Sequence, residues 1–229
     1  RTLKDEGILN MWKIQDAIEL YNINNWGANF FSINNNGHIE VYPTRDPKRP
    51  IDLKVLVDEI QQRGIQLPLL IRFSDILRTR IQTLCESFQT AIQEYNYKSV
   101  YRGVYPIKVN QQRHVVAAIV DAGRPYHFGL EAGSKPELLT TVALIDDPEA
   151  LIICNGYKDE EFIELALLAR RIGKNVILVV EKLSELELIV RLAGKFNVTP
   201  SIGIRIRLSA KGSGRWEASS RGWTNPTTP

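Results

Sequence analysis

The stretch Val100-Tyr-Arg-Gly-Val-Tyr-Pro-Ile-Lys-Val-Asn-Gln-Gln-Arg-His114 decides the fold class of this chain. Residues 100–107 are rich in β-branched and aromatic side chains, which predicts a buried strand. That strand delivers Lys108 at the point where polar residues take over. Because α/β barrels collect their chemistry at the carboxyl ends of their strands, an amine held there can form a Schiff base. Lysines at strand ends are usually solvated charges, so this assignment needs support from the rest of the chain.

Short apolar runs alternate with amphipathic ones from about Leu67 onward, which predicts repeated strand–helix units with parallel strands. A (β/α)8 barrel closes with eight strands, whereas six are expected here, so we predict an α/β fold with a partial TIM-type barrel. A doubly wound open sheet is the alternative, but no glycine-rich dinucleotide loop follows the first expected strand. The expected strands are 67–73, 100–107, 126–130, 151–154, 175–180 and 201–208.

Helical segments are expected between these strands, each with apolar residues recurring every three or four positions. Gly123 is a natural helix stop. Ser134 and Glu137 have the spacing of a capping box, and Ser184 and Glu187 repeat it. The apolar stripes are Leu77, Ile81, Leu84, Phe88, Ile92 and Tyr95; Val115, Ala118, Ile119 and Ala122; Phe162, Leu165, Ala166 and Ala169; and Leu186, Ile189, Val190 and Ala193.

Residues 1–66 form a different piece, which we interpret as a small α+β extension packed on the barrel. Residues 29–33 and 38–42 flank Asn34-Asn-Asn-Gly37, a hairpin turn sequence because Asn and Gly tolerate positive φ. Asp52 is expected to cap a helix that ends at Gly64. The barrel part is then 67–218, and the Thr- and Pro-rich residues 219–229 are expected to be a disordered tail.

The composition is that of an ordinary globular protein, with 44% hydrophobic and 24% charged residues. The net charge is +3, and no basic run is flanked by aromatic residues, so nucleic-acid binding is not expected. Cys85 and Cys154 form no CxxC pair and are expected to be reduced core residues of a cytoplasmic protein. No apolar stretch is long enough for a membrane helix, and no signal-peptide pattern opens the chain.

Polar residues follow most of the expected strands, and in a parallel barrel they would converge on one rim. A carboxylate such as Glu131 near a lysine can steer the lysine's proton. Exposed loops are polar in any barrel, however, and account for most of this set. The candidates are Arg72, Ser74, Asp75, Lys108, Asn110, Glu131, Ser134, Asn155, Lys158, Glu181, Arg205 and Arg207.

Metal and phosphate motifs receive little support. His38, His114 and His127 lie on different expected elements without metal-like spacing, so no metal site is assigned. Lys211-Gly-Ser-Gly-Arg215 is glycine-rich and basic, which suits an anion, but it lacks the P-loop spacing, and a mobile loop is the alternative. No Ser-His-Asp or Cys-His arrangement with a local motif is found.

Long uninterrupted motifs run from about Trp12 to Ala218. They are Trp26-Gly27, Phe31-Ser-Ile-Asn34, Leu67-Pro-Leu-Leu-Ile-Arg-Phe-Ser-Asp-Ile-Leu77, Tyr101-Arg-Gly-Val-Tyr-Pro-Ile-Lys-Val-Asn-Gln-Gln-Arg-His114, Phe128-Gly-Leu-Glu-Ala-Gly-Ser-Lys-Pro-Glu-Leu138, Ile153-Cys-Asn-Gly-Tyr-Lys-Asp159, Ile204-Arg-Ile-Arg-Leu208 and Gly212-Ser-Gly-Arg-Trp216. By these motifs the chain resembles the biosynthetic arginine decarboxylases. Those are pyridoxal-phosphate enzymes with the alanine racemase-like barrel, pyridoxal-phosphate fold type III.

The resemblance implies an enzyme that removes the α-carboxylate of L-arginine to give agmatine and CO2, on the route to putrescine and spermidine. It implies that Lys108, in a Tyr-Pro-x-Lys motif, holds pyridoxal phosphate as a Schiff base, and that Glu131 lies near the cofactor. Family members are also described as using magnesium, for which this sequence offers no ligand set. Full-length members are expected to be homo-oligomers.

Several parts of the family pattern are not found. The second half of the barrel supplies a histidine that stacks on the cofactor ring, a phosphate-binding loop and an acid at the pyridine nitrogen. A C-terminal β domain adds a catalytic cysteine across a dimer interface. The sequence leaves the pattern after Ala218. We therefore expect an N-terminal fragment, or a mispredicted product, that holds the cofactor weakly and is inactive alone.

Three other interpretations stay open. A single-domain pyridoxal-phosphate homeostasis protein would need eight strands and a late phosphate loop. A Schiff-base aldolase would place its lysine on a later strand and need no cofactor. A non-catalytic barrel fragment would merely keep the ancestral pattern. Substrate choice among arginine, ornithine, lysine and diaminopimelate comes from the resemblance alone.

Overall fold

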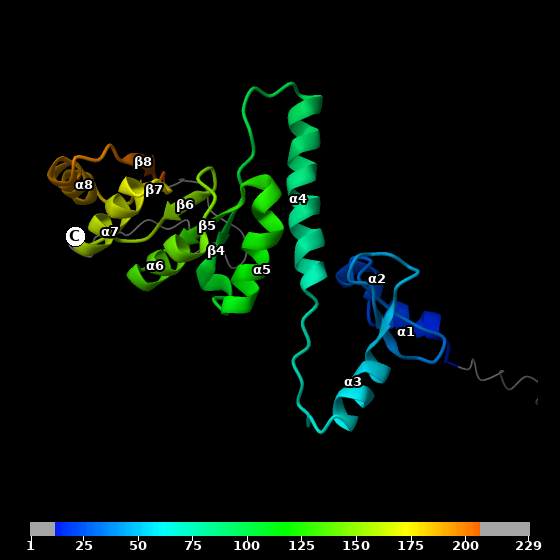
Figure 1. Ribbon diagram of the computed structural model, residues 1–229. Helices are drawn as coiled ribbons and strands as arrows, with labels where there is room; N and C mark the ends of the chain where they lie inside the picture. Colours follow the sequence, from blue (N-terminus) through cyan, green and yellow to red (C-terminus); the bar gives the residue numbers. More distant parts are fainter. Residues whose placement is uncertain (1–11, 207–229) are drawn as a thin grey trace, which may run out of the picture. The chain divides into compact units, whose positions relative to one another are not determined.

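The computed structural model describes residues 12–206, which divide into two compact units between Thr90 and Ala91. The first unit carries a three-stranded antiparallel sheet of order β1-β2-β3, and the second a five-stranded parallel sheet of order β4-β5-β6-β7-β8 (Figure 1). Both units therefore combine helices with a sheet, and the α/β class expected from the sequence is confirmed.

The first unit is built around the expected hairpin. The strands pair Phe31 with Val41 and Ile33 with Ile39, and Gly37 adopts φ +78° in the turn between them, as a hairpin turn of this sequence requires. The elements are α1 (Ile14–Leu20), α2 (Ile23–Trp26), β1 (Phe31–Ile33), β2 (Ile39–Val41), β3 (Ile51–Asp52) and α3 (Leu53–Gln62), followed by α4 (Ser74–Glu94).

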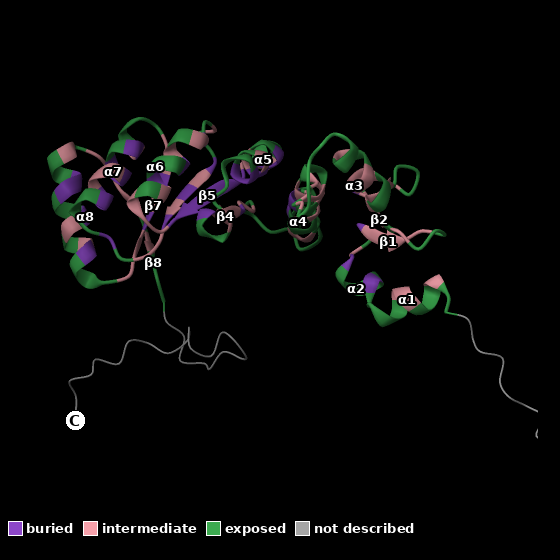
Figure 2. Cartoon of the chain, turned by 90° about the horizontal axis from the view of Figure 1, so that it is seen from below, coloured by how far each residue is buried: buried purple, intermediate pink, exposed green. Residues whose placement is uncertain are grey.

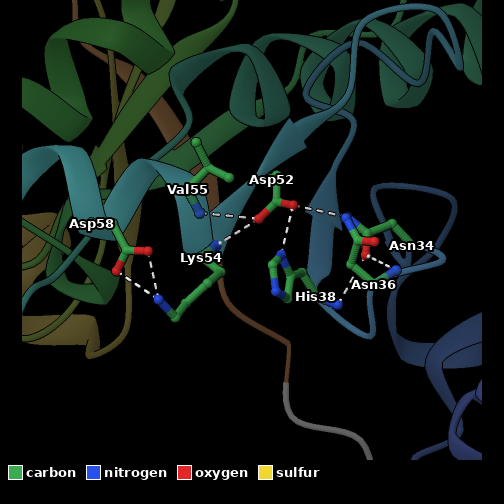
Figure 3. Close-up of polar contacts among 7 residues, drawn as sticks. All are labelled: Asn34, Asn36, His38, Asp52, Lys54, Val55 and Asp58. Carbon is green, nitrogen blue, oxygen red and sulfur yellow. Dashed lines mark hydrogen bonds and ion pairs between the residues drawn. The ribbon is translucent and has the colours of Figure 1, made fainter.

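Asp52 holds the first unit's hairpin and α3 together, as Figure 3 shows. Its carboxylate caps α3 by accepting from the N–H groups of Lys54 and Val55, at 2.9 and 3.1 Å. The same carboxylate accepts from His38 Nδ1 and Asn34 Nδ2, both at 2.8 Å. The expected helix cap is thus confirmed, and it also joins two segments of the sheet.

The segment 67–73, expected to be a strand, is not one, and that prediction is wrong. It lies between α3 and α4 without ladder hydrogen bonds, and the side chains of Leu67 and Leu70 are 57% and 76% exposed. Its apolar composition suggested burial, but a strand needs a partner for its backbone groups, and Pro68 has no N–H to offer.

The second unit repeats strand, helix and parallel strand, with each new strand added beside the previous one. This consecutive order is that of a barrel wall, since a doubly wound sheet reverses its order at a switch point. The remaining expected strands are all present: 151–154 and 175–180 have the expected bounds, and the other three are shorter or shifted. The elements are β4 (Val104–Pro106), α5 (Arg113–Gly123), β5 (Gly129–Ala132), α6 (Lys135–Leu144), β6 (Leu151–Cys154), α7 (Glu160–Arg171), β7 (Asn175–Val180), α8 (Leu183–Phe196) and β8 (Ser201–Ile204).

The core of the second unit lies between the sheet and its helices. Figure 2 shows buried residues in the strands and on one side of helices α6, α7 and α8. Alternate strand residues enter this core, because side chains of a strand point to opposite faces in turn. The fully buried members include Leu130, Leu138, Ile152, Ile163, Leu167, Leu178, Ile189 and Leu192.

Some expected helix features differ in the structure. Ser134 does cap α6, but the Glu137 carboxylate accepts from Gly133 N, at 2.7 Å, instead of from the cap residue. The capping box expected at Ser184 is wrong, because α8 begins at Leu183 and places this serine within the first turn. An apolar stripe shows which face of a helix could pack, but it does not show that another element covers that face. Four stripe residues are exposed: Leu84, Phe88, Tyr95 and Val190.

At low pH, we expect the first unit to lose the contribution of Asp52 to its stability. Burial raises the pKa of Asp52, but hydrogen bonds from His38, Val55 and Asn34 outweigh burial and lower the pKa from 3.8 to about 2. The contribution is therefore present above pH 3.8 and disappears as the pH falls toward 2.

Amide exchange of residues 53–62 in Asp52→Asn tests this prediction. The parent should protect α3 better than the variant near neutral pH, and the two should converge near pH 2. Asp58→Asn, which removes the partner of an exposed Lys54 ion pair, is the matched control and should show a smaller difference. A parent–variant difference that stays constant from pH 6 to pH 2 would contradict the assignment.

Gly129 should not tolerate a side chain. A Cβ on this residue would lie 2.0 Å from the carbonyl oxygen of Leu151, on the neighbouring strand. Because backbone cannot move aside as a flexible side chain can, we expect Gly129→Ala to lower the free energy of unfolding by about 1–3 kcal/mol. Gly194→Ala is the control, since nothing lies within 4 Å of that added atom, and should be neutral or stabilising. Urea unfolding followed by circular dichroism gives both values.

Candidate functional site

The carboxyl ends of β4 to β8 lie at one edge of the sheet, because the strands are parallel. Their register aligns one residue from each strand in a row across the sheet, and residues in such a row face the same side. The row consists of Pro106, Glu131, Ile153, Ile177 and Ser201, so it starts at the carboxyl end of β4 and crosses the sheet to the first residue of β8. Glu131 is thus the one acidic member of this row, and it lies next to the strand that leads to Lys108.

Lys108 lies just beyond the carboxyl end of β4, as expected, but β4 itself is not a buried strand. Its residues are only half-buried, because β4 has a neighbour on one side alone among the described residues. Lys108 lies two residues beyond Pro106, in a short 3-10 turn (η1, Ile107–Val109), and its side chain is exposed. Ile107, which is 1% exposed, anchors the backbone immediately before it.

The backbone that follows Lys108 is also held by hydrogen bonds. The Tyr105 hydroxyl donates to the carbonyl oxygen of Asn110 at 3.3 Å, and the Asn110 side chain accepts from Gln112 N at 3.1 Å as α5 begins. Among the described residues, no acceptor is bonded to the Lys108 amine. An amine on an anchored backbone, with no internal partner, is able to bind an incoming electrophile.

Glu131 is buried, and its side chain has no partner in the part of the chain that the structure describes. The residue is 4% exposed, and neither carboxylate oxygen has a hydrogen-bond partner among the described residues. Such a group is costly to bury, and native structures rarely keep one without a reason. The carboxylate therefore lacks a donor that a ligand at this edge of the sheet could supply.

The neighbouring thiol is not a nucleophile. Burial raises the pKa of Cys154 to about 12, while Lys158 acts to lower the pKa and Glu131 to raise it. The thiol therefore stays protonated near neutral pH. Both cysteines are free and buried, which agrees with the expectation of reduced core residues.

Other expected rim residues are brought together at the ends of β5 to β8. Asn155 N donates to the carbonyl oxygen of Ala132 at 3.0 Å, and Arg205 pairs with Glu181 at 3.1 Å. Lys158 lies beneath them, with a fully buried side chain, against Glu185. Sequence reasoning missed Glu185, because an acidic residue in the first turn of a helix is usually an exposed dipole partner.

The remaining candidates do not extend this site. Arg72, Ser74 and Asp75 belong to the first unit, and Arg207 and residues 211–215 lie outside the described residues. His38 and His127 each bond an aspartate, at 2.8 Å in both cases. Within residues 12–206 no group of three or more His, Cys, Asp or Glu could hold a metal ion. None of the described helices is both long and apolar enough to cross a membrane.

Comparison with curated proteins identifies close relatives. The chain is 54% identical over 205 residues to a biosynthetic arginine decarboxylase of Gloeobacter violaceus, covering 90% of this chain and 32% of the relative. It is 53% identical over 211 residues to the enzyme of that name from Bacteroides thetaiotaomicron, covering 92% and 33%. The chain thus spans about a third of the length of the curated relatives it matches.

Solved structures agree with this relationship. A biosynthetic arginine decarboxylase from Campylobacter jejuni is similar with a TM-score of 0.73 and 37% identity, over 82% of this chain and 31% of that one. A diaminopimelate decarboxylase from M. jannaschi matches with a TM-score of 0.60 over 80% of this chain and 37% of that one, at 18% identity. This second likeness shows a shared fold only, and it supports the partial barrel of fold type III.

A family model matches most of the second unit. The model described as the pyridoxal-binding domain of pyridoxal-dependent decarboxylases matches residues 78–222, well over half of the chain. The matched region contains the whole parallel sheet, with Lys108 and Glu131 at its carboxyl edge. The chain belongs to the pyridoxal-dependent decarboxylase family.

Proposed function

We propose that this chain supplies the first part of the pyridoxal-phosphate site of an arginine decarboxylase, with Lys108 as the covalent anchor of the cofactor. The observation that carries the proposal is the placement of one anchored, unpaired amine at the carboxyl end of a parallel strand. The names of the relatives, and the family to which the chain belongs, support the same chemistry.

The residues at this edge fit such a cofactor. Lys108 provides the amine that an aldehyde needs, and Glu131 on the next strand provides a buried carboxylate whose oxygens have no donor within residues 12–206. A cationic or hydrogen-bond-donating ligand would satisfy that carboxylate and recover part of its desolvation cost. The same ligand could therefore react with Lys108 and donate a hydrogen bond to Glu131.

The division of roles follows from these positions. When bound, pyridoxal phosphate supplies the electron-deficient ring that accepts the electron pair left as CO2 departs. Lys108 Nζ would hold the cofactor through its aldehyde at the end of β4. Glu131 would accept a hydrogen bond from a donor group of the cofactor and so help to orient it. Ile153 and Ile177, which align with Glu131 across the sheet, are half-buried.

We extend the proposal to the substrate from the relatives' names and the resemblance. L-Arginine is converted to agmatine and CO2 for polyamine synthesis in the cytoplasm, by a longer homo-oligomeric protein. No described residue is assigned to the guanidinium group of the substrate. Because this chain spans about a third of its relatives, we propose that by itself it holds the cofactor weakly and does not turn over arginine.

Reductive labelling tests the anchor. After incubation with pyridoxal phosphate and reduction with borohydride, peptide mapping should find Lys108 labelled several-fold more than other exposed lysines, although below one group per chain. Lys108→Arg should abolish the dominant label. Lys182→Arg, which removes another exposed lysine at a strand end of the same sheet, should leave it unchanged. Labels spread evenly over the surface lysines would contradict the proposal.

Replacing Glu131 should raise the stability of the protein and weaken its binding of the cofactor. In Glu131→Leu we expect the free energy of unfolding to rise by about 1–3 kcal/mol, because an unsatisfied buried carboxylate is removed. We expect the label on Lys108 to fall in the same variant. Glu137→Leu is the control of opposite sign, since it removes the acceptor of the Gly133 N–H and should destabilise the protein. A less stable Glu131→Leu protein would show that the Glu131 side chain already has a hydrogen-bond partner in the folded chain.

A further inference from the structure

The second unit contains a buried ion pair that the proposed function does not use. The Lys158 side chain is fully buried, in the loop between β6 and α7, and its amine lies 3.5 Å from Glu185 Oε2. Glu185 is itself only 4% exposed, in the first turn of α8. Burying two charges is costly, and an apolar pair of similar volume is often as stable or more so. Stability alone therefore does not explain this pair.

All three amine hydrogens of Lys158 have an acceptor nearby. Besides Glu185, the amine donates to the carbonyl oxygens of Gly156, at 2.6 Å, and Val179, at 2.5 Å. Gly156 belongs to the loop after β6, and Val179 lies near the end of β7. One ammonium group thus fixes the distance between this loop and the neighbouring strand.

Glu185 completes the connection through the backbone. Its Oε1 accepts from Lys158 N at 3.1 Å, and its Oε2 accepts from Glu181 N at 3.0 Å. The carboxylate therefore joins the loop after β6 to the residue that follows β7. Because charged acceptors make strong hydrogen bonds, these backbone groups are held in one arrangement.

This arrangement determines where two rim residues lie. Gly156 N donates to Glu181 Oε1 at 2.6 Å, and Arg205 donates to the same oxygen at 3.1 Å. Gly156 has φ +77°, a conformation that suits glycine, so its N–H direction depends on the loop's exact path. Lys158 holds the carbonyl of this residue while its N–H holds Glu181. The ends of β6, β7 and β8 are linked in this way.

We propose that Lys158 is a positioning residue, which through Gly156 sets the Glu181–Arg205 pair at the carboxyl edge of the sheet. The link to cofactor binding rests on the proposed function, because the cofactor would lie at that same edge. Lys158 itself is buried and takes no part in the chemistry. Its role is to keep the edge in the shape that the loaded site requires.

The test separates positioning from simple stability. Lys158→Met leaves Glu185 without its cation and is expected to destabilise the unit. The double variant Lys158→Met with Glu185→Met removes both charges, so its melting temperature should return to within a few degrees of the parent. Lys174→Met is the matched control, because this lysine bonds the carbonyl of Ile145 in the same unit, before β7 begins.

Amide exchange of Gly156 is the first readout, since its N–H donates to neither replaced side chain. We expect its protection to fall at least tenfold in the double variant, while the ladder amides of β6 and β7 and the control keep theirs. The reductive label on Lys108 should fall several-fold in the same variant. Together these results would support the proposal.

Three results would overturn it. Parental protection of Gly156 in the double variant would show that the pair does not position the loop. Protection lost across the β6 and β7 ladders as well would show a purely structural role. A loosened loop with an unchanged Lys108 label would show that the edge's shape is irrelevant to binding. If the parent itself takes no label at Lys108, the proposed function fails, and Gly156 exchange still decides whether Lys158 positions the edge.

Discussion

The parallel ladder from β4 to β8 is the constraint on which the candidate site depends. Parallel strands all end at the same edge, so residues separated by many positions in sequence meet there. Glu131 lies beside the strand that leads to Lys108 because Pro106 pairs with it in register. A shift of one residue in this pairing would turn Glu131 toward the helices and remove it from the site.

Buried charge is treated in two ways in this unit. Lys158 and Glu185 satisfy each other and four backbone groups, so their burial fixes geometry. Glu131 has no partner among the described residues, so a ligand could provide the hydrogen-bond donor that its carboxylate oxygens lack. The rigid sheet edge and the unpaired Glu131 carboxylate act together, because a ligand gains more binding free energy from a group that is already held in place.

The first unit follows a different rule, in which one carboxylate organises a small sheet. Asp52 accepts four hydrogen bonds, two from the start of α3 and two from the hairpin. The sequence predicted the cap because Asp before a helical stripe is a strong signal. The bonds to His38 and Asn34 could not be predicted, since they depend on how the hairpin folds back.

By itself the sequence determined the alternation of strands and helices, the hairpin, most helix stripes and the place of Lys108 after its strand, because these depend on local periodicity and turn chemistry. It misjudged residues 67–73 and the burial of β4, since apolar composition does not reveal whether a neighbouring strand exists. Only the tertiary structure decided that Glu131 has no partner within residues 12–206 and that Lys158 lies against Glu185. Both facts depend on which strands lie side by side, and no local pattern in the chain carries that information.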